Sequence, residues 1–256
     1  MAKQTLDSRR HINYNAGRSI TLNPCITLMK RIVFSFVCLM AVLLLSPSIT
    51  FAQERVAEEL EWGVALFDGN TFEGWGFRSD ENRQAFRIQD GAIVGGTMEG
   101  RIPRTQYLVT IREFGDFTLR LQAKMIGGAS ANGGVQIRSF RTPLDSRNPH
   151  EMIGYQADMT STHQYWGSLY EGGRRASWFV AEADQALMRE IVRQGDWNDL
   201  EIVCRGDNIR IYVNGRLTVD YTETDPDIPR RGFIGLQVHD GGPHECWYRN
   251  IRILEH

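Results

Sequence analysis

The chain has 256 residues, of which 42% are hydrophobic, and its 29 basic and 31 acidic residues give a formal net charge of −2 at pH 7. This balance, together with the absence of any basic block in the sequence, argues against nucleic acid as a partner. The length leaves room for one domain with a substantial core and for a targeting segment ahead of it.

The stretch from Met29 to Gln53 has the order of a secretory signal peptide. Lys30 and Arg31 precede an apolar run that extends from Ile32 to Leu45, and the small residue Ala52 stands at the expected cleavage point. The run is shorter than the roughly 20 residues that span a bilayer as a helix. We therefore expect residues 29–52 to be removed and the protein to be periplasmic or secreted, without a stable membrane span. An uncleaved membrane anchor is the alternative.

Residues 1–28 show no periodicity and precede the better start at Met29, so we interpret them as an upstream mis-start without structure. The fold is expected to occupy residues 60–256 as a single domain. Only Cys204 and Cys246 lie beyond the expected cleavage point, which excludes a disulfide-rich scaffold. Both fall at apolar strand positions that suit small buried side chains, and one bridge between them is the alternative.

From Leu66 onward, hydrophobic and polar residues alternate with the period of two that is typical of half-buried strands. Clear examples are "DFTLRLQAKM" (116–125), "NDLEIVC" (198–204) and "NIRIYVNG" (208–215). Asp90-Gly91 and Asn214-Gly215 are dipeptides of two-residue hairpins, and residues 206–208 predict another tight connection. Only residues 181–194 have a helical pattern, and the last third of this segment fits a strand equally well. These elements predict an antiparallel β-sandwich or barrel.

Three of the predicted strands carry long amides and one ionisable group each on the face that would normally meet water. The side chains concerned are Gln136 and Arg138, Gln156 and Asp158, and Gln237 and His239. Such groups can recognise a polyhydroxylated ligand if the sheet is hollowed. The alternatives are plainer: the glutamines bond across strands, Arg138 pairs with Asp158, and His239 only ends its strand.

The segment "HQYWGSLYEGGRR" follows "GYQADM" directly and adds aromatic side chains. Trp166 and Tyr170 offer faces on which a sugar ring can stack, with Glu171 and Arg174 beside them. Core or rim packing is the alternative for both aromatic residues.

The chain resembles the 3-keto-disaccharide hydrolase domain family of bacteria. The resemblance runs from "LFDGNTFEGW" (66–75) to "RNIRIL" (249–254), through "FRIQDGAIVGG", "ANGGVQIRS", "GYQADM", "WGSLYE", "GDWNDLEIVCRGDNIRIYVNG" and "GFIGLQVHDG" in the order of the family. It implies a concanavalin A-like jelly-roll sandwich of two antiparallel sheets with a ligand cleft on the concave one. Two departures stand out: the family's "NSG" is Asn132-Gly133-Gly134, and Gly154 replaces a common glutamate, whose role then falls to Glu171 or Glu151 if it is needed.

The resemblance implies cleavage of glycosides whose C3 hydroxyl has been oxidised to a ketone, by removal of the C2 proton and elimination, followed by hydration. Asp158 and His239 are the expected base or ligands of a divalent cation, with no nucleotide or organic cofactor. Gln136, Arg138, Gln156 and Gln237 would hold sugar hydroxyls. Tyr170 or Glu171 would lie at the leaving-group side, and Trp166 would stack.

Two other functions remain open from the sequence. A conventional glycoside hydrolase places two carboxylates on either side of the bond, and the Glu-x-Asp-x-x-Glu pattern of jelly-roll glucanases does not occur in this chain. A non-catalytic carbohydrate-binding module also fits exposed aromatic and amide side chains. Turnover of an oxidised against an unoxidised sugar separates all three functions.

Overall fold

The structure is a computed structural model that describes residues 56–256, apart from residues 58, 60, 176 and 177. The expected mis-start (1–28) and signal peptide (29–52) lie outside the described residues. Arg55–His256 forms one compact unit. In the part of the chain that the structure describes, no helix is long and apolar enough to cross a membrane.

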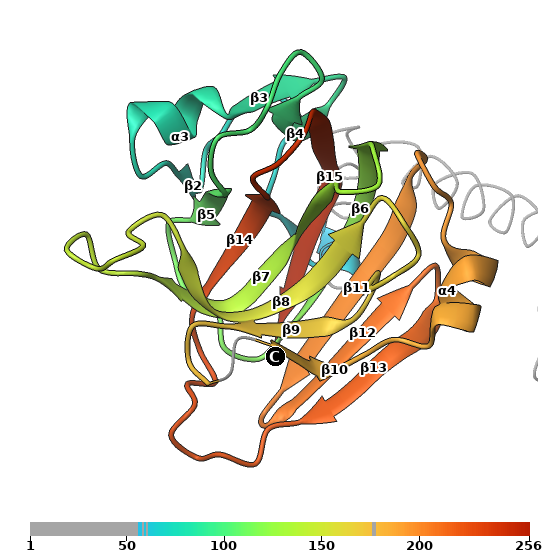
Figure 1. The fold of residues 1–256 in the computed structure, drawn as a ribbon. Helices are drawn as coiled ribbons and strands as arrows, with labels where there is room; N and C mark the ends of the chain where they lie inside the picture. Colours follow the sequence, from blue (N-terminus) through green and yellow to red (C-terminus); the bar gives the residue numbers. More distant parts are fainter. Residues whose placement is uncertain (1–55, 58, 60, 176–177) are drawn as a thin grey trace, which may run out of the picture. The chain divides into compact units, whose positions relative to one another are not determined.

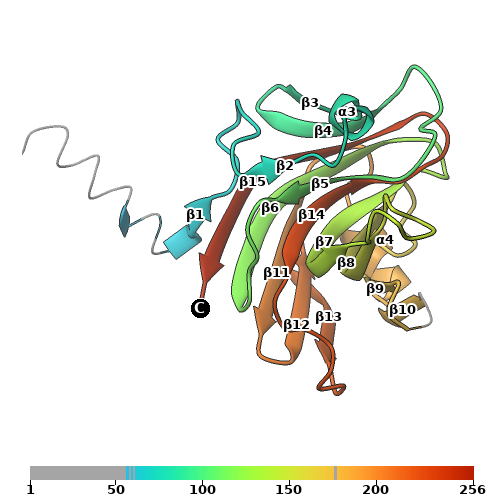
Figure 2. The same cartoon turned by 90° about the vertical axis from the view of Figure 1, so that its left-hand side faces the viewer.

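Two antiparallel sheets face each other, as the strand pattern predicts (Figures 1 and 2). The first has the order β13-β12-β11-β6-β15-β4-β3, with β1 paired to β15, and the second has the order β10-β9-β8-β7-β14-β5-β2. The first contains β1 (Val64–Ala65), β3 (Phe86–Gln89), β4 (Ala92–Thr97), β6 (Phe117–Gly127), β11 (Asn198–Arg205), β12 (Asn208–Val213), β13 (Arg216–Thr222) and β15 (His244–Glu255). The second contains β2 (Trp75–Gly76), β5 (Gln106–Thr110), β7 (Asn132–Arg141), β8 (Met152–Thr160), β9 (Leu169–Gly172), β10 (Trp178–Ala181) and β14 (Phe233–Val238).

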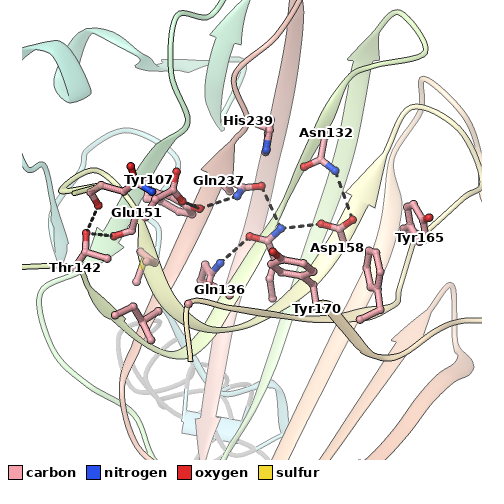
Figure 3. A pocket seen from close by; sticks show the side chains of 17 residues that line it. Tyr107, Asn132, Gln136, Thr142, Glu151, Asp158, Tyr165, Tyr170, Gln237 and His239 are labelled. Atoms are coloured by element: carbon pink, nitrogen blue, oxygen red, sulfur yellow. Dashed lines mark hydrogen bonds between the residues drawn. The ribbon is translucent and has the colours of Figure 1, made fainter. Parts of the chain in front are cut away.

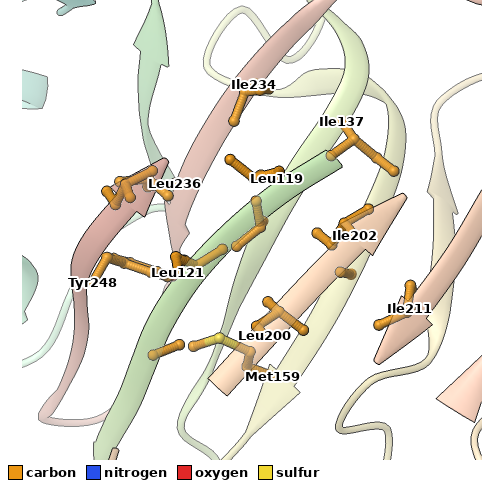
Figure 4. Packing of buried hydrophobic residues seen from close by; sticks show 14 of the residues in the cluster. Leu119, Leu121, Ile137, Met159, Leu200, Ile202, Ile211, Ile234, Leu236 and Tyr248 are labelled. Carbon is orange, nitrogen blue, oxygen red and sulfur yellow. The ribbon is translucent and has the colours of Figure 1, made fainter. Parts of the chain in front are cut away.

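The core lies between the sheets and takes one face of each strand (Figure 4). Leu119 and Leu121 of β6 pack there with Leu236 of β14 and Ile137 of β7, and each of these side chains is at most 4% exposed. Because side chains alternate along a strand, burying these residues turns their neighbours in β7, β8 and β14 to the outer face of the second sheet. This alternation is what delivers polar side chains to a common surface.

The predicted turns are confirmed by the backbone. Asp90 (φ 51°) and Gly91 (φ 69°) join β3 to β4, and Asn214 (φ 50°) and Gly215 (φ 76°) join β12 to β13. Positive φ at both central positions is what a two-residue hairpin with the right twist requires. The connection between β11 and β12 is equally short, with Gly206 at φ 51°.

Between residues 63 and 256, the described residues form two short helices beside the sheets. The helical pattern predicted for residues 181–194 is confirmed in its middle part as α4 (Gln185–Ile191), whose N-cap residue Asp184 accepts hydrogen bonds from two backbone amides of the first turn. The other helix, α3 (Asp80–Gln84), was not predicted, because five residues are too few to show a helical period.

Arg138 contradicts the prediction from strand alternation. Its backbone has φ 46°, and the pairing of β7 with β8 and with β14 shifts register around it, which is the pattern of a β-bulge. The bulge turns the side chain inward. Arg138 is 1% exposed and its guanidinium donates to Asp116 Oδ1 (2.8 Å), Gly206 O (2.7 Å) and Gly115 O (3.2 Å). Arg138 therefore ties the second sheet to the loop that leads into β6 and to the turn between β11 and β12. It neither faces the outer surface nor pairs with Asp158.

Cys204 in β11 and Cys246 in β15 are buried and free, so the alternative of a bridge between them is wrong. Burial raises the pKa of both thiols to about 12. They pack as small hydrophobic side chains.

Candidate functional site

A pocket of about 570 Å³ lies on the outer face of the second sheet (Figure 3). Its floor comes from Gln136, Gln156, Asp158 and Gln237, one or two from each of β7, β8 and β14. These four side chains are 2–4% exposed although they do not belong to the apolar core. The structure thus brings the three amides and Asp158 together in one hollow, and the pocket has the size of a typical small-ligand site.

The three glutamines form one hydrogen-bonded chain. Gln136 Nε2 donates to Gln156 Oε1 (2.8 Å), and Gln156 Nε2 donates both to Asp158 Oδ1 (2.7 Å) and to Gln237 Oε1 (3.1 Å). Ser139 Oγ donates to Gln136 Oε1 (2.7 Å) and fixes the first amide. Gln156 thus uses both amide hydrogens on its neighbours and serves to position them, because buried amides are costly to leave unpaired.

Asp158 is the buried carboxyl at one end of this chain. Burial raises its pKa to about 7, although hydrogen bonds from Gln156 and Asn132 partly oppose the rise. Desolvation disfavours the ionised form, and Asp158 forms no ion pair with any Lys or Arg among the described residues. A carboxyl that titrates near pH 7 can accept a proton from carbon and hold it, which an ordinary exposed aspartate does poorly.

A second carboxyl, that of Glu151, lies at the opposite end of this hydrogen-bonded row of glutamines, as Figure 3 shows. Gln237 Nε2 donates to Tyr107 Oη (2.8 Å), and Tyr107 Oη donates to Glu151 Oε2 (2.9 Å). Burial and the charge of Glu151 raise the pKa of Tyr107 well above its usual value. Tyr107 therefore stays protonated, and Glu151, with Thr142 nearby, makes this end of the pocket polar.

Three half-buried rings form the other flank, which we call the aromatic wall: Tyr165, Tyr170 and Phe179. Tyr165 stacks on Phe179 with ring centroids 4.2 Å apart, and Tyr170 meets Phe179 edge to face at 5.4 Å. Tyr170 reaches the pocket as the sequence predicts, because it pairs with Gln156 across β8 and β9 and shares its face.

His239 also lines the pocket, just beyond the end of β14. Its backbone N–H donates to Asn132 O (3.1 Å), which places it beside the residue whose amide approaches Asp158. Its Nδ1 lies 2.9 Å from Asp240 O and 3.2 Å from Asp240 Oδ1. The ring is thus oriented with Nε2 available, and a chemical role for His239 stays a prediction.

The donor set of this site does not fit a resident divalent cation. Among the described residues, no group of three or more His, Cys, Asp or Glu side chains is arranged to hold a metal ion. Asp158 and His239 would be two such ligands, and Asp158 Oδ1 already accepts a hydrogen bond from Gln156. Hard divalent cations take several oxygen ligands, and two are few. No step proposed below depends on a metal.

Two predicted site residues lie elsewhere. Glu171 alternates with Tyr170 on β9 and so points to the opposite face, where it is 1% exposed and pairs with Arg174 (2.9 Å) and Arg175 (2.7 Å). Trp166 is 2% exposed and belongs to the apolar core. Their placement in the pocket, predicted together with that of Arg138, is wrong. The alternation along β9 already predicts that Glu171 faces away from Tyr170, whereas the position of Trp166 depends on the loop between β8 and β9.

Many members of the family that the sequence resembles have a glutamate at the position of Gly154. In this protein the position has no room for a side chain. A Cβ at this position would lie 2.0 Å from Ser139 Oγ and 2.7 Å from Ser139 Cα, and φ is 149°. Ser139 occupies this space because the bulge at Arg138 brings it there. Glu151, three residues earlier in the chain, is the carboxylate that reaches the pocket.

Sequence reasoning missed Tyr107, Tyr165 and Phe179. Tyr107 lies in the buried strand β5, between Gln106 and Leu108, and its alternation with Leu108 was the only available signal. Tyr165 lies in the turn between β8 and β9, and Phe179 lies in the edge strand β10. No local sequence pattern indicates that these two rings meet.

The comparisons with known proteins agree with this architecture. The family model of the 3-keto-alpha-glucoside-1,2-lyase-like domain matches residues 61–254. No curated protein matches the chain. A candidate glycosyl hydrolase from Parabacteroides distasonis superimposes with a TM-score of 0.55 at 18% identity, over 78% of this chain and 96% of that one.

Two further solved structures share the fold. A carbohydrate-binding module from Bacillus subtilis has a TM-score of 0.52 at 18% identity, over 72% of this chain and 96% of that one. A Bacillus subtilis protein of unknown function with a galectin-like fold has a TM-score of 0.51 at 9% identity, over 72% and 90% of the two chains. At these identities the similarity establishes the fold, and the predicted jelly-roll β-sandwich is confirmed.

Proposed function

Because the chain belongs to the 3-keto-alpha-glucoside-1,2-lyase-like domain family, we propose that it cleaves 3-keto-glycosides by elimination across C1 and C2. The membership makes it a carbohydrate-active jelly-roll protein, and the reaction is our inference from the pocket. The observation that carries it is Asp158: a buried carboxyl with a pKa of about 7, fixed by Gln156 in a polar pocket.

The ketone at C3 acidifies the hydrogen on C2. In the proposed reaction Asp158 accepts that proton, and the electrons of the C2–H bond form the enolate of the C3 ketone. The enolate then expels the C1 substituent: the C1–O bond breaks, its electron pair leaves with the oxygen, and a 1,2-double bond remains. Water added across this bond restores a saturated 3-keto sugar, so the sum of both steps is hydrolysis.

The other pocket residues support these steps. Gln136 and Gln237 each donate one hydrogen bond within the amide chain, which leaves each a second amide hydrogen for the enolate oxygen at C3. His239 is proposed to give a proton to the departing oxygen, and His239→Ala tests this. Glu151 offers acceptor oxygens for the remaining hydroxyls of the sugar, and Tyr107 orients this carboxylate by donating to its Oε2.

The test uses methyl 3-keto-glucoside and unoxidised methyl glucoside with the purified protein. We expect turnover of the oxidised sugar alone, with an unsaturated ketone seen by ultraviolet absorbance and loss of the C2 deuterium from a labelled substrate. Turnover of the plain glucoside would instead indicate a conventional glycosidase that uses Asp158 and Glu151 as its two carboxylates. The same assay with and without EDTA tests the dependence on a divalent cation, and we expect none.

A non-catalytic carbohydrate-binding module is the second candidate, favoured by the aromatic wall and by the amide side chains of the pocket floor. Binding of either sugar without turnover would support it. We also propose that the protein is exported, supported by the sequence of residues 29–52. Sequencing of the N-terminus from cell fractions should place the mature start at Gln53 in the periplasm or medium.

A further inference from the structure

The aromatic wall lies next to Asp158. The backbone N–H of Asp158 donates to Ser168 O, and the N–H of Gly167 donates to Asp158 O, both at 3.0 Å. The loop that carries Tyr165 is therefore fastened to the backbone of the proposed base. Tyr170 pairs with Gln156, whose amide holds Asp158. Figure 3 shows the same arrangement, with Tyr165 and Tyr170 near Asp158 and with Glu151 and Thr142 at the far end.

Tyr165 has φ 68°, a left-handed conformation that bulky residues rarely adopt. Nothing in the turn itself needs a tyrosine there, because glycine adopts this conformation without strain. The strained backbone places the ring flat on Phe179 inside the pocket. Strain of this kind concentrates at functional sites, where the surrounding structure compensates for it.

An ionic cluster with two buried carboxylates packs behind the aromatic wall. Glu171 lies between the pocket residues Tyr170 and Gly172 on β9, and Arg175 joins its carboxylate (2.7 Å) to that of Glu223 (2.8 Å) at the end of β13. The side chains of Glu171 and Glu223 are each 2% exposed. The cluster fastens the edge of the second sheet to the first, so the wall is a preorganised surface.

The proposed reaction determines which part of the sugar lies at each end of the pocket. A base that takes the C2 proton must touch C2, and C1 and C3 lie on opposite sides of C2. The sugar carries its remaining hydroxyls beyond C3, and the polar end with Glu151, Tyr107 and Thr142 suits them. The C1 substituent then points toward the aromatic wall.

We propose that the aromatic wall is the leaving-group subsite and takes a planar, apolar ring, so that the preferred substrates are 3-keto-glucosides of aryl alcohols. This inference rests on the proposed function and names its substrate class. Offset or edge-on contacts between rings are favourable beyond the area that they bury, whereas a methyl leaving group makes no such contact.

The experiment compares kcat/KM for phenyl and methyl 3-keto-glucoside in three proteins: the wild type, Phe179→Ala and Trp178→Ala. Trp178 is the matched control: it is on the same strand, pairs with Glu171 on the opposite face, is 64% exposed and does not line the pocket. Its ring meets that of Phe179 only edge to face, with centroids 6.4 Å apart. The intrinsic reactivity of a phenolic leaving group is the same for each protein and cancels when their phenyl-to-methyl ratios are compared. We expect Phe179→Ala to lower the ratio about 2- to 10-fold, as the loss of one aromatic contact predicts, and Trp178→Ala to leave it unchanged.

Tyr165→Gly is a second variant for the case that Phe179→Ala does not fold, since glycine accepts the backbone conformation at this position. The proposal is overturned if the wall variants keep the wild-type ratio, or if Trp178→Ala lowers it equally.

If the wild type turns over neither substrate, the proposed function fails. The subsite is then tested by calorimetric binding of the same two glucosides, in which equal affinity for both overturns it and a preference for the phenyl compound that Phe179→Ala removes supports it.

Discussion

Replacing Asp158 with asparagine separates two effects of this carboxyl: its role as a base in the reaction and the loss of folding stability that comes from its burial. The amide of the asparagine would keep an oxygen for the hydrogen bond from Gln156 Nε2 and would carry no charge. The carboxyl is 4% exposed, and burial raises its pKa from 3.8 to about 7. A difference of about 3 pKa units corresponds to at most about 4 kcal/mol of folding free energy, at 1.36 kcal/mol per unit.

The sign follows from the raised pKa. The folded state binds the proton of Asp158 more tightly than the unfolded state, so this stability is fully present below pH 3.8 and is lost as the pH rises through about 7. The wild type should therefore lose stability relative to Asp158→Asn across this window. Other groups titrate in both proteins and cancel in the difference between them.

The measurement is urea denaturation of both proteins at several pH values from 4 to 8.5. We expect the free energy of unfolding of Asp158→Asn minus that of the wild type to grow by up to about 4 kcal/mol over this range. Turnover of methyl 3-keto-glucoside should fall at least about 100-fold in the variant, and the wild-type kcat/KM should rise as the pH increases through about 7, where Asp158 loses its proton. A stability difference that is independent of pH would refute the assignment of the raised pKa, and a variant with near wild-type turnover would refute the role as base.

Three further changes test the frame of the pocket. Gly154→Ala should destabilise the fold by about 3 kcal/mol, because its Cβ would meet Ser139 and its φ is unfavourable. Thermal denaturation should show this loss against the control Gly100→Ala, whose Cβ would have no heavy atom within 4 Å. Arg138→Met should cost about 3 kcal/mol, since it leaves the carbonyl groups of two turns and Asp116 without their donor; a loss below about 1 kcal/mol in urea would contradict this. Burial opposes ionisation of Glu223, but the hydrogen bonds from Arg175 and Tyr155 outweigh it and lower the pKa to about 2, so its contribution is present above pH 4.5 and lost toward pH 2; Glu223→Gln should lose about 2 kcal/mol at pH 7 and show a weaker acid dependence.

Much of the floor of the site followed from alternation in the sequence. Gln136, Gln156, Asp158 and Gln237 are separated by up to 101 positions in the chain, yet each stands opposite apolar neighbours in its own strand, so their common face was predictable once the strands formed one sheet. The hairpin dipeptides were equally informative, because positive φ restricts the residues that can occupy a two-residue turn.

Arg138 shows where this reasoning stops. A single bulged residue reverses the face of a side chain, and the letters "QIRSF" look the same with or without it. The bulge also decides the place of Ser139, which fixes Gln136 and fills the space at Gly154. The groups that accept hydrogen bonds from its guanidinium are distant in the chain: they lie in the loop before β6 and in the turn between β11 and β12.

The sequence by itself determined the strands, their turns and the inward or outward face of most side chains, because these depend on the geometry of one or two neighbouring residues. Only the tertiary structure decided that Arg138 leaves the outer face, that Trp166 lies in the apolar core, and that Tyr165, Tyr170 and Phe179 stand together beside Asp158. The pKa of Asp158 belongs to the same class, since it depends on how completely the assembled sheet and its loops exclude water from one carboxyl.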